Sequence, residues 1–546
     1  MNRKMPSRRW KIIATVFGLL IVALLSINFF ASMYATKKLV AAFSKNQQYA
    51  FHFENLRLNI FTGSARAKNV HVSPISSSSN DTIQRVNFTT TSINLSGIHW
   101  YSLLFKKNIC IGEIQLEHPV LAVRNLQAAK KKRNYPKTSF SLYHLIHPEF
   151  ESLRINKFEV SDGKISAAGK DSSHFYFASN SISFELNDFF ADSAITHAGK
   201  VFEIRNAAAS FKNVHGFFTR GLYRVAIPTF TFSTKDSMID IDSLFFSPTA
   251  DKTQFAKKLG YQKAYRDIML AGVRVHSGKF LRIIDQQQVL IDAIEISYAR
   301  IYNYKDKSLP VKSAKYVLHH TFLDSLPFKI DLEKVKVNDG KVAYDLLAAG
   351  ATEPGHVDFD SIRFTLSNFS NVNMNDTMRA DISASGMSQA ALRIHLVLPL
   401  ARDEFYTSGT LGPHELPIWN SILTNYKTPM QIKTGRAKSA TFSFTANATK
   451  GTGTMTFIYS DLKVNTLNSQ HETGGVKNAV KTFVANRIII DEDNPHHDVL
   501  RIGKIDFPRN PERNFISYVY HMIFDGMESS VGLKEEKMKK EILKSH

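Results

Sequence analysis

The 546-residue sequence contains a single cysteine, Cys110. One thiol cannot form an internal disulfide, and it excludes a zinc site built from several cysteines. The chain also has neither the Gly-x-Ser-x-Gly turn of serine hydrolases nor the His-Glu-x-x-His helix of zinc proteases. Residues 272–280 resemble a phosphate-binding loop, but there is one residue too many between the glycines, and Phe280 stands where a Mg²⁺-binding Ser or Thr belongs. We therefore expect no enzyme activity and no cofactor.

Patterns that bind metals are equally scarce. His319-His320 and His496-His497 are adjacent pairs, and neighbouring side chains on a strand point to opposite faces, so neither pair is suited to share an ion. The acidic run at 491–494 lacks the glycine and the spaced carboxylates of a calcium-binding loop. The sequence predicts no metal site.

The charge is strongly positive, with a formal net value of +21. Such a charge favours contact with nucleic acid, anionic lipid headgroups or acidic polysaccharide. No helix-turn-helix, zinc finger or RNP motif occurs, and the basic residues are scattered apart from both termini and a cluster at 130–133, which is typical of a solvated loop. We expect no nucleic-acid partner.

One long stretch has no charge at all. Residues 12–34 contain no charged side chain, and the residues before them are basic without an acidic one. About 20 apolar residues span a bilayer as a helix, and a basic flank stays in the cytoplasm. We expect a cytoplasmic tail at 1–11, a single membrane helix at 12–34 and an exported body after it. A cleaved signal peptide is the alternative, although its apolar region is normally shorter, at about 7–15 residues.

Period-2 alternation, the pattern of strands with one apolar face, is abundant. Val335 and Val337 alternate with polar residues before Asn338-Asp339-Gly340, and the alternation resumes at Val342. Asn, Asp and Gly tolerate positive φ, so this segment predicts a β-hairpin with its turn at 338–340. Similar hairpins are predicted at 58–65, 114–121, 158–165, 273–280 and 430–437.

Longer alternating segments at 177–189 and 357–369 predict single strands that follow the hairpins. Helices are predicted at 251–270 and 411–426. Residues 515–524 carry an apolar stripe at helical spacing that is too short to span a membrane. Docking of this helix on the β body, contact with a membrane surface and contact with a partner protein remain open.

These patterns predict a mainly β fold, with a membrane helix followed by a long, twisted antiparallel sheet and a few short helices. The apolar face of such a sheet must be covered. A second sheet, closure of the sheet on itself or bound acyl chains would each cover it, so an open groove and a closed core both remain possible. The residues that we expect to line the face are Phe184, Leu186, Val335, Val337, Ile362 and Phe364.

Several segments resemble the AsmA-like family, the bacterial envelope proteins related to TamB. The basic start and membrane helix are followed by strand-like segments at 62–72, 91–95 and 111–121, and residues 451–464 are similar to the end of AsmA-type domains. The resemblance covers roughly residues 12 to 465 and does not extend to 466–546. It implies an inner-membrane anchor and a periplasmic, taco-like β-groove that binds or conducts phospholipid acyl chains without a catalytic group.

We therefore expect a single-pass inner-membrane protein, with most of the chain in the periplasm, that acts in envelope lipid transport or homeostasis. The alternative is a non-enzymatic scaffolding protein with a closed β core, which holds an envelope partner through its C-terminal helix. Binding of an envelope polysaccharide is a third possibility. The expected body consists of a repetitive β domain at 35–410, a β segment with a leading helix at 411–510, and an amphipathic helix with a Lys-rich tail at 511–546.

Overall fold

A computed structural model provides the structure of the protein. It describes residues 49–75, 85–124, 150–169, 175–286, 288–423, 430–466 and 490–533, and isolated positions between 26 and 37. The predicted tail at 1–11, most of the predicted membrane helix at 12–34 and the cluster at 130–133 lie outside these residues. In the described part, no helix is long and apolar enough to cross a bilayer.

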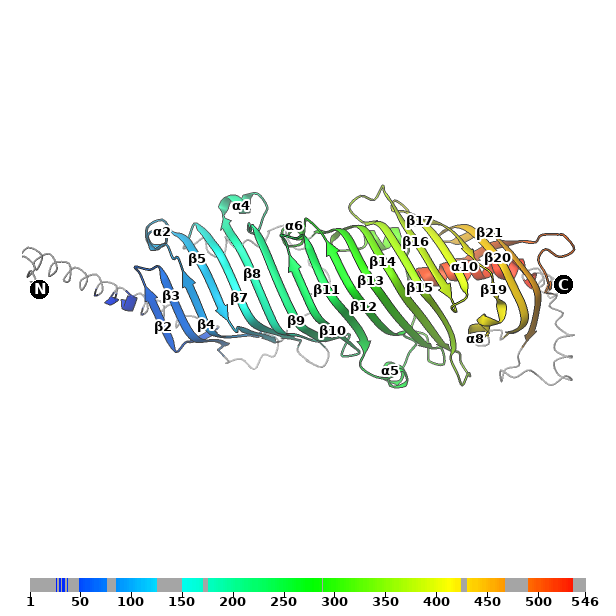
Figure 1. The fold of residues 1–546 in the computed structure, drawn as a ribbon, viewed down its shortest axis with the longest axis horizontal. Helices are drawn as coiled ribbons and strands as arrows, with labels where there is room; N and C mark the ends of the chain where they lie inside the picture. Colours follow the sequence, from blue (N-terminus) through cyan, green and yellow to red (C-terminus); the bar gives the residue numbers. More distant parts are fainter. Residues whose placement is uncertain are drawn as a thin grey trace, which may run out of the picture. The chain divides into compact units, whose positions relative to one another are not determined.

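The prediction of a mainly β protein is confirmed, with 61% strand and 14% helix among the described residues. The strands belong to two compact units, one comprising Met1–Gly221 and Ala226–Asp236, the other Leu222–Val225 and Ser237–His546. Within each unit, strands that follow one another in the chain lie side by side for most of the sheet (Figure 1).

The first unit is a sheet in which β2 and β3 form a hairpin, β3 pairs with β4, and β7, β8 and β9 follow in order. In its described part, two short helices connect the strands. The elements are β1 (Tyr49–His52), β2 (Asn55–Asn59), β3 (Ser64–Pro74), β4 (Arg85–Ser96), α2 (Trp100–Phe105), β5 (Asn108–Glu117), β6 (Val120–Arg124), β7 (Ser152–Ala168), β8 (Tyr176–Asp192), α4 (Ser193–His197), β9 (Asn206–Phe218) and most of β10 (Tyr223–Ser233).

The second unit continues the same construction and ends in a longer helix. Its elements are β11 (Met238–Pro248), α5 (Lys252–Leu259), β12 (Tyr265–His276), α6 (Arg282–Gln286), β13 (Gln288–Asp306), α7 (His319–Asp324), β14 (Lys329–Leu347), β15 (Gly355–Ser370), β16 (Thr377–Gly386), β17 (Ala390–Pro399), β18 (Glu404–Leu411), β19 (His414–Glu415), the 3-10 helix η1 (Leu416–Trp419), α8 (Asn420–Leu423), β20 (Met430–Asn447), β21 (Lys450–Thr466), β22 (Ile502–Pro508) and α10 (Phe515–Ser530).

The predicted repetition of hairpins is wrong. Residues 335–344 lie inside the single strand β14, and its ladder with β13 runs straight through Asp339 and Gly340. Residues 158–165 and 430–437 likewise lie inside β7 and β20. Residues 114–121 span β5 and β6, which both pair with β7, and 273–280 span the end of β12. The 58–65 copy alone is a hairpin, with Asn59 opposite Ser64.

The turn-like residues act instead as irregularities within strands. In β7, Asp162 has a φ of 49°, and the pairing with β8 shifts on both sides of Gly163. In β20, Gly435 has a φ of 141°, again where the register shifts. A bulge inserts one extra residue into a strand. Apolar residues at odd positions before the bulge and at even positions after it therefore lie on the same face of the sheet.

The prediction of a wholly antiparallel sheet is also wrong, because both units are mixed. β13 and β14 pair in parallel over their full length, and β5 and β6 pair in parallel with β7. Parallel neighbours need a crossover connection. Residues 307–328, which include α7, provide that crossover between β13 and β14.

The predicted helix at 251–270 is half right. Residues 252–259 form α5. Asp251 caps its start, because the Asp251 side chain accepts a hydrogen bond from the Gln254 backbone N–H, and Gly260 caps its end in the left-handed conformation. The remainder enters β12. The predicted helix at 411–426 is shorter still, since η1 and α8 cover only 416–423 within the described residues.

The C-terminal apolar stripe forms α10, and of the three possibilities left open for it the structure shows docking on the β body. Its buried residues are Tyr518, Val519, Met522, Gly526 and Ser530. Small residues allow β22 and α10 to approach closely, because a Cβ added at Gly503 of β22 would lie 2.4 Å from the Gly526 carbonyl oxygen. The exposed fractions of Ile516 and Tyr520 are 77% and 44%, so the predicted stripe is only partly the packed face.

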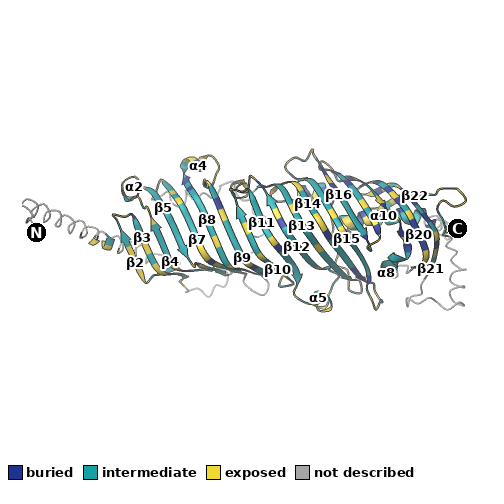
Figure 2. Ribbon diagram, viewed as in Figure 1, coloured by how far each residue is buried: buried dark blue, intermediate teal, exposed yellow. Residues whose placement is uncertain are grey.

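α10 also caps the edge of the sheet. Among the described strands, β22 pairs with β21 alone. The backbone N–H groups of Lys504 and Asp506 donate to Ser529 Oγ and Asp525 Oδ2 of α10, each at 2.9 Å. The largest buried cluster of the chain forms where α10 and the 307–328 crossover cover β16–β22, and Figure 2 shows buried residues concentrated at these strands and α10.

We expect Gly340→Ala to lower the free energy of unfolding by roughly 1–3 kcal/mol. A Cβ at Gly340 would lie 2.8 Å from the backbone oxygen of Ala299 in β13. Gly278→Ala is the control, because nothing lies within 4 Å of its added Cβ. Denaturant unfolding measures both variants, and equal stabilities would favour an exposed turn at 338–340.

Met522→Ala is expected to lower the free energy of unfolding of the second unit by about 2–5 kcal/mol, since Met522 is fully buried under the sheet. Ile516→Ala, on the exposed side of the same helix, should change it by about 0.5 kcal/mol or less. Hydrogen exchange in β22 and α10 reports the difference. Similar exchange in the two variants would contradict the docking of α10.

Candidate functional site

The apolar side chains of the first unit form two rows that cross its strands. Directly paired residues share a face of the sheet, so each row can be followed from partner to partner. One row runs through Leu56, Ala67, Ile93, Leu116, Val160, Phe184 and Ala209, and the other through Leu58, Ala65, Leu95, Ile114, Phe158, Leu186 and Ala207.

Two matching rows cross the second unit. One runs through Ile239, Val275, Ile294, Val335, Leu366, Ala380 and Leu396, and the other through Ile241, Val273, Ile296, Val337, Phe364, Ile382 and Ile394. In each unit, the two rows define what we call its apolar face.

Five of the six predicted lining residues lie in these rows. Phe184 and Leu186 are neighbours on β8, and the Phe184 ring contacts that of Phe158, with 5.9 Å between centroids. Val337 is paired directly with Phe364, and Val335 with Leu366.

The sixth residue, Ile362, lies at an irregularity of β15. The pairing with β16 shifts between Asp360 and Arg363, and Ser361 has a φ of 51°. A Cβ added at Gly340 would lie 3.6 Å from the Ile362 Cβ. Ile362 therefore lies beside Gly340 of β14 and is not in a row.

The apolar face is covered to different degrees along the chain. All six predicted residues are half-buried. Both buried hydrophobic clusters found in the described residues lie in the second unit. In the first unit, Phe158, Val160, Phe184 and Leu186 are only half-buried, so the described part of that unit leaves its apolar face without a core packed on it.

A separate polar cluster surrounds Asp345 on β14. Its carboxylate accepts hydrogen bonds from the Tyr302 hydroxyl at 2.5 Å and from His356 Nδ1 at 2.6 Å, and Lys252 Nζ of α5 lies 3.3 Å away. The Lys252 ammonium also lies over the rings of Tyr302 and Tyr304, at 4.6 and 5.3 Å from their centroids. This cluster ties α5 to β13, β14 and β15.

The environment of Asp345 keeps it ionised. Burial alone would raise the pKa of this carboxyl, but the hydrogen bonds from His356, Tyr302 and Lys252 outweigh burial and hold the pKa below its usual range. Burial, and then the bond to Asp345, raise the pKa of the Tyr302 phenol. Three donors from three different elements converge on this carboxylate, so the cluster is built to hold α5 in place.

The histidine pairs do not lie as the sequence predicts. His319 and His320 belong to helix α7, and they hydrogen-bond to the carbonyl oxygens of Pro399 and Leu400 at 2.8 and 2.7 Å. The rings of His496 and His497 contact each other, with 4.1 Å between centroids. In the regions that the structure describes, no group of three or more His, Cys, Asp or Glu side chains could hold a metal ion.

Sequence comparison adds no relative to this description. No protein-family model matches the chain, and no curated protein matches it in sequence. The apolar face and the residues around it are therefore the features that bear on function.

Sequence reasoning missed two features. It did not find the Asp345 cluster, because its members are spread over residues 252–356 and nothing in the local pattern brings them together. It also misjudged the packed side of α10, although Gly526 and Ser530, four residues apart, were a visible signal of close helix packing.

We expect Asp345→Asn to cost roughly 1–3 kcal/mol and to release α5, because two close donors lose a charged acceptor. Since the pKa of Asp345 is lowered on folding, its contribution is complete above about pH 4, the usual aspartate range, and is lost only as the pH falls through the lower folded value. Hydrogen exchange of residues 252–259 at neutral pH measures the effect.

Asp381→Asn is the matched control, because Asp381 also accepts from a histidine, His395, at 2.7 Å, but is 64% exposed. An exposed pair of this kind contributes about 0–1 kcal/mol. Unchanged exchange in α5 of the Asp345 variant would show that the cluster does not hold the helix.

Proposed function

We propose that the protein is an AsmA-like envelope protein whose apolar face binds or conducts phospholipid acyl chains. In this proposal residues 12–34 anchor the chain in the bacterial inner membrane, the β body lies in the periplasm as a taco-like groove, and the protein acts in envelope lipid transport or homeostasis.

The carrying observation is the half-buried apolar face of the first unit. A row such as Leu116, Val160 and Phe184 continues over many strands without a buried cluster on it in the described residues. An uncovered apolar surface of this extent is rare on a soluble protein and marks a binding surface.

Acyl chains suit this surface because they are long and apolar and need no polar partner. Each methylene removed from water contributes about 0.8 kcal/mol, so a chain that follows the rows is held without any specific contact. The rows run across the strands, and consecutive strands therefore extend one continuous surface.

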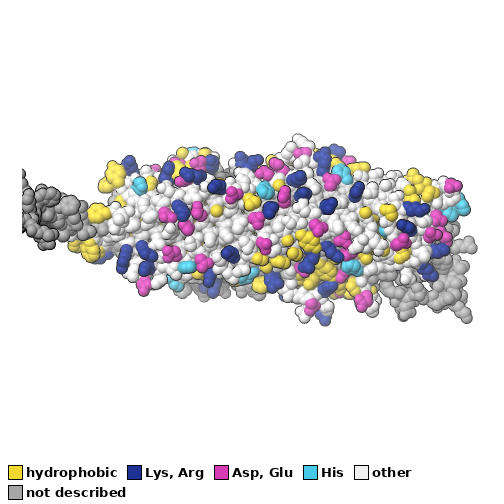
Figure 3. Space-filling model, in the orientation of Figure 1, with side chains coloured by type: hydrophobic (Ala, Val, Ile, Leu, Met, Phe, Trp, Pro, Cys, Tyr) yellow, Lys and Arg dark blue, Asp and Glu magenta, His cyan; other side chains and the backbone are white. Residues whose placement is uncertain are grey.

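The side chains on the other face of the sheet are polar. Ser183, Glu185 and Lys336 are exposed and alternate with half-buried apolar residues on the same strands. The space-filling view shows Lys, Arg, Asp and Glu side chains interspersed over the visible surface (Figure 3). A surface of mixed charges of this kind is suited to face water, while the other side of the sheet binds lipid.

A second candidate is a scaffolding protein with a closed core, favoured by the fully buried packing of α10 on β21 and β22. Met455, Ile505 and Met522 are each 0% exposed there. That part of the sheet is covered by the chain itself and has no room for a ligand.

The test uses Phe184→Asp in the purified full-length chain, with native mass spectrometry to measure bound phospholipid. We expect lipid occupancy to fall at least about tenfold, because an ionised carboxylate in an acyl environment costs several kcal/mol, while the fold is retained because Phe184 is only half-buried. Ser183→Asp, the adjacent exposed residue, is the control and should bind lipid normally.

A chain that unfolds on Phe184→Asp and that never carries lipid would overturn the groove and favour the scaffold. Retained lipid in a folded Phe184→Asp variant would also reject this surface as the binding site.

A further inference from the structure

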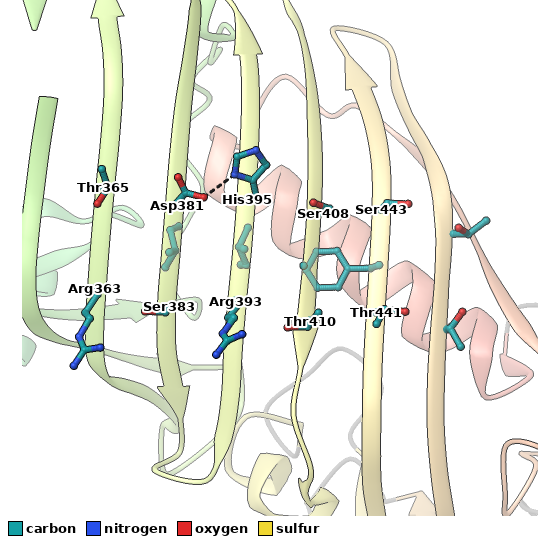
Figure 4. Close-up of a pocket in the computed structure, with 16 residues that line it drawn as sticks. Arg363, Thr365, Asp381, Ser383, Arg393, His395, Ser408, Thr410, Thr441 and Ser443 are labelled. Atoms are coloured by element: carbon teal, nitrogen blue, oxygen red, sulfur yellow. Dashed lines mark hydrogen bonds and ion pairs between the residues drawn. The ribbon is translucent and has the colours of Figure 1, made fainter. Parts of the chain in front are cut away.

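A depression of about 760 Å³ lies on the second unit, lined mainly by polar side chains of β15–β18, β20 and β21 (Figure 4). These side chains form two rows of directly paired residues, which alternate along the strands with those of the apolar face. One row is Arg363, Ser383, Arg393, Thr410, Thr441 and Thr456, and the other is Thr365, Asp381, His395, Ser408, Ser443 and Thr454.

Two arginines flank a serine at one side of the depression. Arg363 and Arg393 are each paired directly with Ser383, one from either neighbouring strand. Strands lie about 4.8 Å apart, so the two backbones are separated by roughly 10 Å, and the small Ser383 side chain leaves the space between the arginines open. Both arginine side chains extend in the same direction in Figure 4.

Neither guanidinium is paired with a carboxylate of the described residues. Arg363 and Arg393 are exposed, and neither side chain makes an ion pair or hydrogen bond with any residue that the structure describes. Six other arginines are paired with carboxylates, namely Arg205, Arg274, Arg300, Arg402, Arg436 and Arg501. What distinguishes Arg363 and Arg393 from other arginines without an ion pair is their position on either side of one serine at the edge of a depression.

Among the side chains of the two rows, the carboxylate is that of Asp381, and it is bonded to a histidine. Asp381 Oδ1 lies 2.7 Å from His395 Nδ1 (Figure 4). Two like charges on either side of one serine repel each other, and an anion between them would convert that repulsion into two charge-assisted, fork-shaped contacts. The geometry therefore favours a bound anion at Ser383.

The other side of the depression is an array of hydroxyl groups. Ser408, Thr410, Thr441, Ser443, Thr454 and Thr456 lie there on three adjacent strands. None of these hydroxyls has a hydrogen-bond partner in the described residues, and each can both donate and accept. A ligand that itself carries several hydroxyls matches this array.

We propose that this depression binds an acidic sugar, with its phosphate or carboxylate between Arg363 and Arg393 and its hydroxyls over the Ser and Thr array. The site is separate from the apolar face, so it stands whether or not that face binds lipid.

Isothermal titration of the full-length chain tests the site with glucose 6-phosphate and glucuronate as acidic probes and with glucose as the neutral one, all at one ionic strength. We expect saturable binding of at least one acidic probe and much weaker binding of glucose. Preference between the two acids identifies phosphate or carboxylate as the recognised group. Arg363→Gln and Arg393→Gln should each weaken that binding by about tenfold or more.

Arg379→Gln is the matched control. Arg379 lies on β16, between the strands of the two tested arginines, is exposed, and does not line the depression, so its loss removes the same charge from outside the site. Affinity unchanged by this variant supports the site. An equal loss in all three variants would show only general attraction to a basic protein and would overturn the proposal.

Inorganic phosphate and the Thr410→Val variant test whether the hydroxyl groups of a sugar contribute to binding. If phosphate alone binds as tightly as glucose 6-phosphate, and Thr410→Val changes neither, the hydroxyl array plays no part and the assignment to a sugar is wrong. A Thr410→Val variant that loses affinity for the acidic sugar, but keeps its affinity for phosphate, supports the assignment.

Discussion

Strands of this length must keep their apolar side chains on one side, and the rest of the structure depends on how they do so. A strand of 17 to 19 residues, such as β7 or β14, accumulates twist, and a slip of one residue sends every later side chain to the other face. Interruptions at Asp162-Gly163 and at Gly435 lie within strands and separate segments of opposite parity. They allow the sheet to bend while the apolar rows continue.

An apolar face of this kind has to be covered, and the two units differ in how this is done. In the second unit, α10 and the 307–328 crossover bury the face over β16–β22, where Gly503 and Gly526 allow the helix and strand to come close. In the first unit, the described residues place nothing comparable on Phe158, Phe184 and their neighbours. One chain can therefore combine a lipid-binding face in the first unit with a closed, stable core in the second.

The polar cluster at Asp345 follows a different principle, because it is satisfied by partners that the fold brings together. Three donors satisfy this buried carboxylate and hold α5 against the strands. Arg363 and Arg393 are exposed and have no carboxylate paired with them in the described residues. They stand on either side of one serine at the edge of a depression, which is why this pair carries the proposal of a site for an acidic sugar.

The alternation of the sequence was sufficient to predict the mainly β fold and the strands at 177–189 and 357–369. It also placed Phe184 and Leu186 on the apolar face of the first unit, and Val335, Val337 and Phe364 on that of the second. These features follow from local chemistry, since the period of 2 is a property of the extended backbone.

The same local chemistry could not decide what Asn338-Asp339-Gly340 does, because a hairpin turn and a bulge favour the same residues. Only pairing with β13 through Asp339 and Gly340 shows a continuous strand. The parallel neighbours, the side of α10 that packs, and the meeting of Lys252, Tyr302, Asp345 and His356 likewise depend on contacts between residues far apart in the chain. The sequence by itself therefore determined the strands and their apolar side, and tertiary structure decided how the strands pair and where that side is covered.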